Sequence, residues 1–87
     1  MEQFERAIRH NMASAERDMK HDEDRHGFVI GAVRKFWSVY EAHKIDDQQF
    51  DRLIEILSGF AGGTYRTFIS EMVRDYKDGN PPIIVGY

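Results

Sequence analysis

The 87-residue chain contains no cysteine. Without a thiol it cannot form a disulfide scaffold, a cysteine-ligated zinc site or a thiolate nucleophile. It also lacks an apolar run that approaches the ~18 residues of a membrane span, and residues 1–10 carry charges instead of the apolar core of a signal peptide. We therefore expect a cytoplasmic protein that makes no contact with a membrane.

The chain has no excess of basic residues. Its 12 Lys and Arg stand against 15 Asp and Glu, which gives a net charge of −3. A protein that holds nucleic acid by its phosphates needs clustered Lys and Arg side chains. Nucleic acid is therefore not an expected partner.

Residues suited to covalent catalysis are scarce as well. No serine lies in a nucleophile-elbow motif or beside a sequence neighbour that would act as its base. A chain this short also has little room for both a core and an enclosed cavity of a few hundred Å³. We expect a protein that is not an enzyme and that carries no cofactor.

The chain is nevertheless apolar enough to fold, because 41% of its residues are hydrophobic and 13% are aromatic. Its length suits one domain. We expect residues 1–80 to form this helical domain, and residues 81–87 to form an extended apolar tail that packs on the bundle or across a dimer interface. A small domain hides only about 60–65% of the surface of its unfolded chain, so any large apolar side chains that one bundle cannot hide should be covered by a second chain.

Apolar residues recur with helical spacing, which predicts an all-α bundle of three to four amphipathic helices. The first helix covers residues 4–19, and the polar segment 21–27 is either its last, solvated turn or a loop. A second helix over residues 28–42 is apolar around most of its circumference, which places it at the centre of the bundle.

A capping box is the clearest local signal in the chain. Asp46 is placed to cap a third helix, and Gln49 follows three residues later, where the motif requires it. We expect this helix to end within residues 58–63. Thr64 should cap a fourth helix over residues 65–78, which glycine and two prolines then terminate.

A run of acidic and histidine side chains forms a candidate metal site. If the first helix continues through it, residues three or four positions apart face the same way and can hold zinc, manganese or iron. The candidate ligands are Asp18, His21, Asp22 and His26. The His21-Asp22 pair resembles the metal-binding dyad of the HD phosphohydrolases, which implies a metal-dependent hydrolase as one alternative function. A charged, hydrated helix end is the other interpretation.

The glycine-rich corner before the fourth helix is a candidate anion site. Gly62, Gly63 and Thr64 lead into a helix start, where free N–H groups and the helix dipole favour negative charge. Arg66 could clamp a phosphate or carboxylate. This predicts a nucleotide-binding or anion-binding protein as the first alternative function, ahead of the metal-dependent hydrolase. The spacing of a phosphate loop is absent, so a tight corner with a threonine cap explains the same residues.

The remaining candidates point to protein contact. The second helix has more apolar faces than two neighbours readily cover, and a tail after two prolines needs no apolar side chains unless it docks. Both features favour a homodimer or another protein partner. Acidic side chains could steer the chain to a basic partner. The candidate interface residues are Trp37, Tyr40, Asp46, Asp47, Asp51, Ile83, Ile84, Val85 and Tyr87.

The leading hypothesis from the sequence is therefore a small acidic binding protein without enzymatic activity. It would act as a regulator, adaptor or inhibitor, of the kind that phages and other mobile elements encode.

Overall fold

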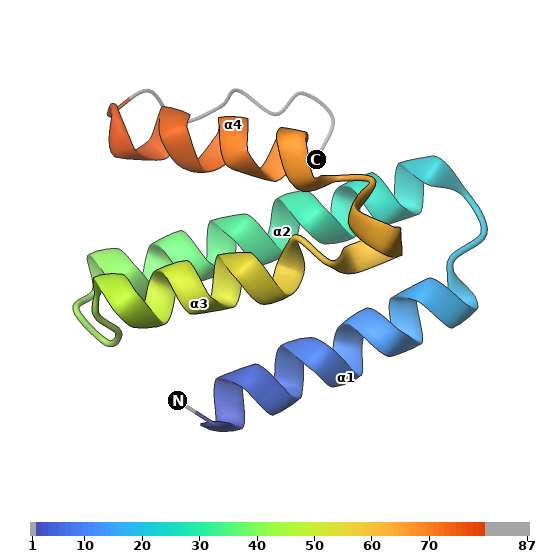
Figure 1. Ribbon diagram of the computed structural model, residues 1–87, viewed down its shortest axis with the longest axis horizontal. Helices are drawn as coiled ribbons and strands as arrows, with labels where there is room; N and C mark the ends of the chain where they lie inside the picture. The colour runs from blue at the N-terminus through green and yellow to red at the C-terminus, as the bar shows by residue number, and fades with distance from the viewer. Residues whose placement is uncertain (1, 80–87) are drawn as a thin grey trace.

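Four α-helices and one short 3-10 helix account for most of residues 2–79, the part of the chain that the computed structural model describes (Figure 1). The elements are α1 (Glu2–Asp18), α2 (Asp22–Glu41), α3 (Asp47–Leu57), η1 (Phe60–Gly63) and α4 (Arg66–Lys77). The expected all-α class is confirmed. The expected tail, with its interface candidates Ile83, Ile84, Val85 and Tyr87, lies outside the described residues.

The helices form a bundle in which each helix runs opposite to the one before it (Figure 1). α2 packs against both α3 and α4, in keeping with its broad apolar circumference, whereas α1 packs mainly against α3 and also contacts η1. Within residues 2–79, no helix combines the length and the hydrophobicity needed to cross a membrane.

The core lies where α2, α3, η1 and α4 meet. Seven large side chains are almost completely shielded from solvent, and burying each of them contributes about 1.5–3 kcal/mol. They are Val29, Val33, Phe50, Leu53, Leu57, Phe60 and Ile69. α3 supplies three of them although it is the shortest α-helix, because it is enclosed by α1 on one side and by α2 on the other.

α2 begins at Asp22, so the prediction of a loop or a last helical turn over residues 21–27 is wrong. The acidic residues 22–24 occupy the first turn of α2, where the positive end of the helix dipole stabilises carboxylates. The Arg25 guanidinium donates to the Met19 carbonyl from Nη2 at 3.0 Å and from Nε at 3.3 Å. This contact closes the short connection between α1 and α2.

The capping box of α3 is confirmed. The Asp46 side chain accepts from the Gln49 N–H at 2.8 Å, and the Gln49 side chain accepts from the Asp46 N–H at 3.0 Å. At the other end, the Ser58 hydroxyl donates to the Ile54 carbonyl at 2.8 Å. α3 therefore has satisfied polar groups at both ends.

Thr64 does not cap α4, which corrects the sequence prediction. The chain turns at Ala61 and Gly62, whose φ angles of 53° and 71° lie in the left-handed region. The Thr64 hydroxyl then points back and donates to the Ala61 carbonyl at 2.7 Å. α4 starts after Tyr65, which makes no side-chain cap. The threonine thus closes the corner and leaves the start of α4 without a side-chain cap.

Candidate functional site

Aromatic rings from three helices gather at the end of the bundle where α2 passes into α3. The Trp37 ring lies 5.2 Å from Tyr40, 5.3 Å from Tyr76 and 5.7 Å from Phe50, measured between centroids. Trp37 and Tyr76 are stacked at 24°, whereas Phe50 meets the indole edge-on at 75°. Phe50 is buried, and the other three rings are half-buried. The rings are thus supported from inside and remain partly open to solvent.

Acidic side chains adjoin these rings. The neighbouring Asp47 carboxylate favours the protonated phenol, as a hydrogen-bond acceptor for it and through its negative charge, and so raises the pKa of Tyr40 above its ordinary value of 10.0. Asp51 lies one helical turn further along α3, and its carboxylate is 3.6 Å from Lys77 Nζ. The same ammonium group lies 5.6 Å from the centre of the Phe50 ring. We call Trp37, Tyr40, Tyr76, Asp47 and Asp51 the aromatic–acidic surface.

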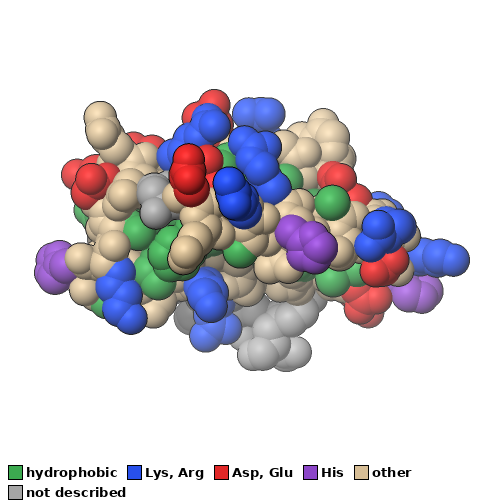
Figure 2. Space-filling model, turned by 90° about the horizontal axis from the view of Figure 1, so that it is seen from below, with side chains coloured by type: hydrophobic (Ala, Val, Ile, Leu, Met, Phe, Trp, Pro, Cys, Tyr) green, Lys and Arg blue, Asp and Glu red, His purple; other side chains and the backbone are tan. Residues whose placement is uncertain are grey.

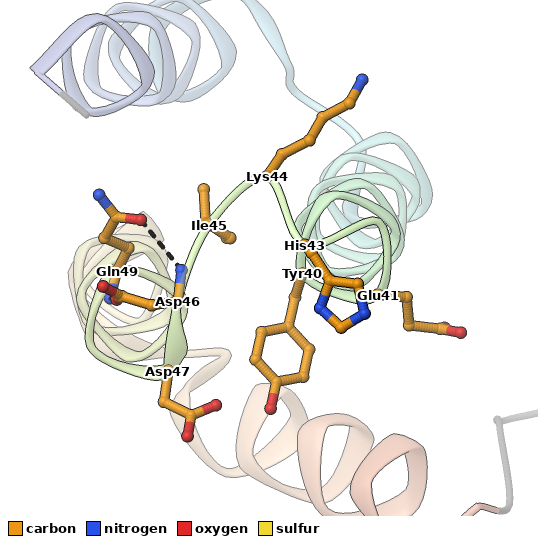
Figure 3. Close-up of a pocket in the computed structure, with 8 residues that line it drawn as sticks. All are labelled: Tyr40, Glu41, His43, Lys44, Ile45, Asp46, Asp47 and Gln49. Atoms are coloured by element: carbon orange, nitrogen blue, oxygen red, sulfur yellow. Dashed lines mark hydrogen bonds between the residues drawn. The ribbon is translucent and has the colours of Figure 1, made fainter.

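A hollow of about 710 Å³ adjoins the aromatic–acidic surface at the α2–α3 connection (Figure 3). Tyr40 and Asp47 line it together with Glu41, His43, Lys44, Ile45, Asp46 and Gln49. Its acidic groups outnumber its single lysine, so the hollow has a negative balance of charge. A second hollow of about 310 Å³ lies beside it, lined by Trp37, Glu41, Tyr76 and Gly79. The two hollows share Glu41, which makes them neighbours on one surface.

His43 holds the α2–α3 connection in an unusual backbone conformation. Its φ of 57° is left-handed, a region in which side chains other than glycine are disfavoured by about 1–2 kcal/mol. The His43 N–H bonds to the Tyr40 carbonyl, and the Lys44 N–H bonds to the Val39 carbonyl, both at 3.0 Å. These two bonds form a Schellman motif, which usually carries glycine at this position. Sequence reasoning missed this residue because no glycine marks the end of the helix.

The structure brings four of the predicted interface residues to one end of the bundle: Trp37, Tyr40, Asp47 and Asp51. Asp46 lies at the same end and lines the hollow, but its side chain also caps α3. Tyr76 was not among the candidates, because its position against Trp37 depends on how α4 packs on α2.

The metal-site candidates do not form a common cluster. Asp18 ends α1 and pairs with Arg17 at 3.3 Å, while His21 and Asp22 lie beyond the break that separates α1 from α2. The His26 ring lies against Phe68, with 4.6 Å between the ring centres. Across residues 2–79, no three His, Asp or Glu side chains are grouped so that they could hold a metal ion.

The anion-site candidates lie together at the corner before α4, but an acidic group of the chain itself lies there too. The Glu16 carboxylate of α1 accepts a hydrogen bond from the Ala61 N–H. The Arg66 guanidinium folds back over Gly63, and its Nε and Nη2 atoms are both 3.7 Å from the point where a Cβ on that glycine would stand. Gly62 has open space around it. The corner therefore binds a carboxylate, and this carboxylate is intramolecular.

No family model, curated protein or solved structure matches the chain.

Proposed function

We propose that the protein is a binding protein without enzymatic activity, a regulator, adaptor or inhibitor that contacts a basic protein partner through its aromatic–acidic surface. One observation carries this proposal: three half-buried aromatic rings, held by packing, lie directly beside exposed carboxylates at one end of the bundle.

The aromatic rings supply what an interface needs at its centre. Tryptophan and tyrosine are the residues most often found to dominate binding energy at protein interfaces. Trp37 is already fixed between Tyr40, Tyr76 and Phe50. Because the ring is held before the partner arrives, binding loses little side-chain entropy there. When a partner buries the remaining exposed area of these rings, most of the free energy gained would therefore contribute to affinity.

The carboxylates favour a partner with a positively charged surface. Ion pairs between exposed side chains contribute only about 0.2–1 kcal/mol each, so Asp47 and Asp51 cannot supply most of the affinity. Their charge does accelerate the approach of a positively charged surface and disfavours an acidic one. The rings therefore supply most of the affinity, whereas the acidic residues determine partner choice and association rate.

Photo-crosslinking in the cells that express the protein tests this proposal. A benzophenone amino acid at Glu41, between the two hollows, should give a covalent adduct with another protein. The same group at Ser70, an exposed position on α4, is the matched control. Adding Asp47→Asn and Asp51→Asn should weaken the adduct at Glu41. Equal labelling from both positions, or an adduct that does not respond to the charge change, would refute the proposal.

A further inference from the structure

A largely apolar groove runs between α1 and α2, away from the aromatic–acidic surface. It encloses about 410 Å³ and continues at Asn11 and Phe28 into a smaller hollow of about 230 Å³. The residues that line the groove include Phe4, Ala7, Phe28, Gly31, Ala32 and Lys35. Figure 2, which views the molecule from the side of α1, shows hydrophobic side chains reaching the surface among charged ones.

The groove exists because α1 is fastened to α3 more closely than to α2. Ile8 and Ala15 of α1 are buried in the core, Glu5 pairs with Arg52 of α3 at 3.1 Å, and Glu16 bonds to the corner after α3. α1 packs much less extensively against α2 than against α3. Apolar side chains on the facing sides of both helices, such as Phe4 and Phe28, are therefore only half-buried.

Gly31 lies on this groove in the middle of α2, and packing among residues 2–79 does not explain it. A Cβ added at Gly31 would have no neighbour within 4 Å. Glycine inside a helix is destabilising relative to alanine. At Gly31 no other part of the described chain uses the space that a side chain would fill. A glycine at such a position is suited to the close approach of another backbone.

The charges beside Gly31 are arranged symmetrically along α2. Asp24, Phe28, Gly31 and Lys35 are spaced by four, three and four residues, which puts them on one face of the helix. Asp24 and Lys35 are both exposed. They are equally far from the midpoint between Phe28 and Gly31. When two copies of such a helix cross in antiparallel fashion about that midpoint, each aspartate faces the lysine of the other copy.

We propose that a second copy of this chain fills the groove, with the two α2 helices antiparallel about a two-fold axis. Phe28 of each copy then lies against Gly31 of the partner subunit, and Asp24 lies against Lys35 of the partner subunit. The α1 helices flank the pair and supply the further area toward the roughly 800 Å² per partner that a stable interface needs. Trp37 lies on the other side of α2, so the dimer presents two copies of the aromatic–acidic surface.

Sedimentation equilibrium of the full chain tests the dimer. The expected mass is twice the 10.2 kDa of one chain. Gly31→Leu places a side chain where the partner helix must approach, and it should raise the dimer dissociation constant at least about tenfold. A Cβ at this position meets no neighbour within 4 Å in the part of the chain that the structure describes, so circular dichroism should show an unchanged fold. Ser70→Leu, which adds the same exposed side chain on α4, is the matched control and should leave the dimer intact.

A charge exchange tests the pairing itself. Asp24→Lys alone or Lys35→Asp alone brings like charges together, and each should weaken the dimer about tenfold. The double variant restores opposite charges and should return to within about threefold of the wild type. Asp22→Lys makes the same charge change in the same helical turn but off this face, and it should have no comparable effect.

Three results would overturn the proposal. The first is a monomer at every concentration up to about 1 mM, because a constant weaker than this corresponds to a negligible interface. The second is a dimer that tolerates Gly31→Leu, which would place the interface elsewhere on the molecule. The third is a double charge variant that is as weak as the single ones, which would show that Asp24 and Lys35 do not meet.

Discussion

Replacing Glu16 by alanine removes the carboxylate that accepts the Ala61 N–H at the corner between α3 and α4. This bond joins α1 to a turn that is costly in itself, because Ala61 has a left-handed φ of 53°. The alanine backbone is disfavoured there by about 1–2 kcal/mol. The bond from Glu16 therefore helps to hold Ala61 in its strained left-handed conformation.

The expected loss follows from the type of bond and from its exposure. A hydrogen bond to a charged group contributes about 1.5–3 kcal/mol, but the Glu16 side chain is exposed and water competes for the same N–H. We therefore expect Glu16→Ala to reduce the free energy of unfolding by about 1 kcal/mol. For a domain of this size, that corresponds to a melting temperature about 4–8 °C lower. Glu16→Gln keeps a neutral acceptor and should lose less.

Urea unfolding followed by circular dichroism measures this difference, and hydrogen exchange of the Ala61 amide shows its location. The amide should exchange faster in Glu16→Ala than in the wild type, because its acceptor is gone. Glu71→Ala is the control, since Glu71 is also exposed on a helix and makes no ion pair within the described residues. If both alanine variants unfold alike and Ala61 exchange is unchanged, the proposed role of Glu16 is wrong.

Three further predictions concern the α2–α3 connection. The raised pKa of Tyr40 means that the folded state holds the phenolic proton more tightly, so its contribution to stability is complete below pH 10.0 and is lost as the pH rises through the folded value. In an alkaline absorbance titration, Asp47→Asn should lower the pKa of Tyr40 toward its ordinary value, and superimposable curves would contradict the assignment. His43→Gly relieves a left-handed φ and should raise the unfolding free energy by about 0.5–1 kcal/mol, with no gain arguing against strain. Asp46→Ala removes the cap on the Gln49 N–H and should cost about 1 kcal/mol in thermal or urea unfolding, whereas a neutral result would show that the capping box is dispensable.

The parts of the fold that were predictable from sequence are those decided within a few residues. The cap of α3 is an example, because the side chains of Asp46 and Gln49 reach each other's backbone wherever that helix packs. The start of α2 is the opposite case. A polar run is compatible with a loop or with a first turn, and His21 gives no side-chain cap to decide between them. The helix dipole and the contact between Arg25 and Met19 decide it in the folded chain.

The corner before α4 shows why a local motif can mislead. Thr64 has the right residue type for a cap, but the left-handed turn at Ala61 directs its hydroxyl backwards. The hydrophobic pattern of the sequence gives no indication that Ala61 adopts a left-handed conformation. Glu16, which bonds to this turn, is far away in the sequence. A contact of this kind follows only from the position of α1 on η1.

The candidate surface was predictable in part. The broad apolar circumference of α2 identified Trp37 and Tyr40 as residues that neighbouring helices cover incompletely, and both are half-buried. Tyr76 and Lys77 reach the same place only because α4 packs on α2. The left-handed His43 had no sequence signal at all, since the usual glycine is absent.

The most direct test of the proposed function is the dissociation constant of the partner identified by crosslinking at Glu41, measured by calorimetry for two alanine variants. Trp37→Ala removes the central ring of the aromatic–acidic surface, and Phe68→Ala removes a half-buried ring elsewhere, on α4 against His26. We predict that Trp37→Ala weakens binding at least about tenfold, as expected for a central anchor, and that Phe68→Ala leaves binding within about threefold of the wild type. Equal losses for the two variants, or a Trp37→Ala protein that binds like the wild type, would contradict the account.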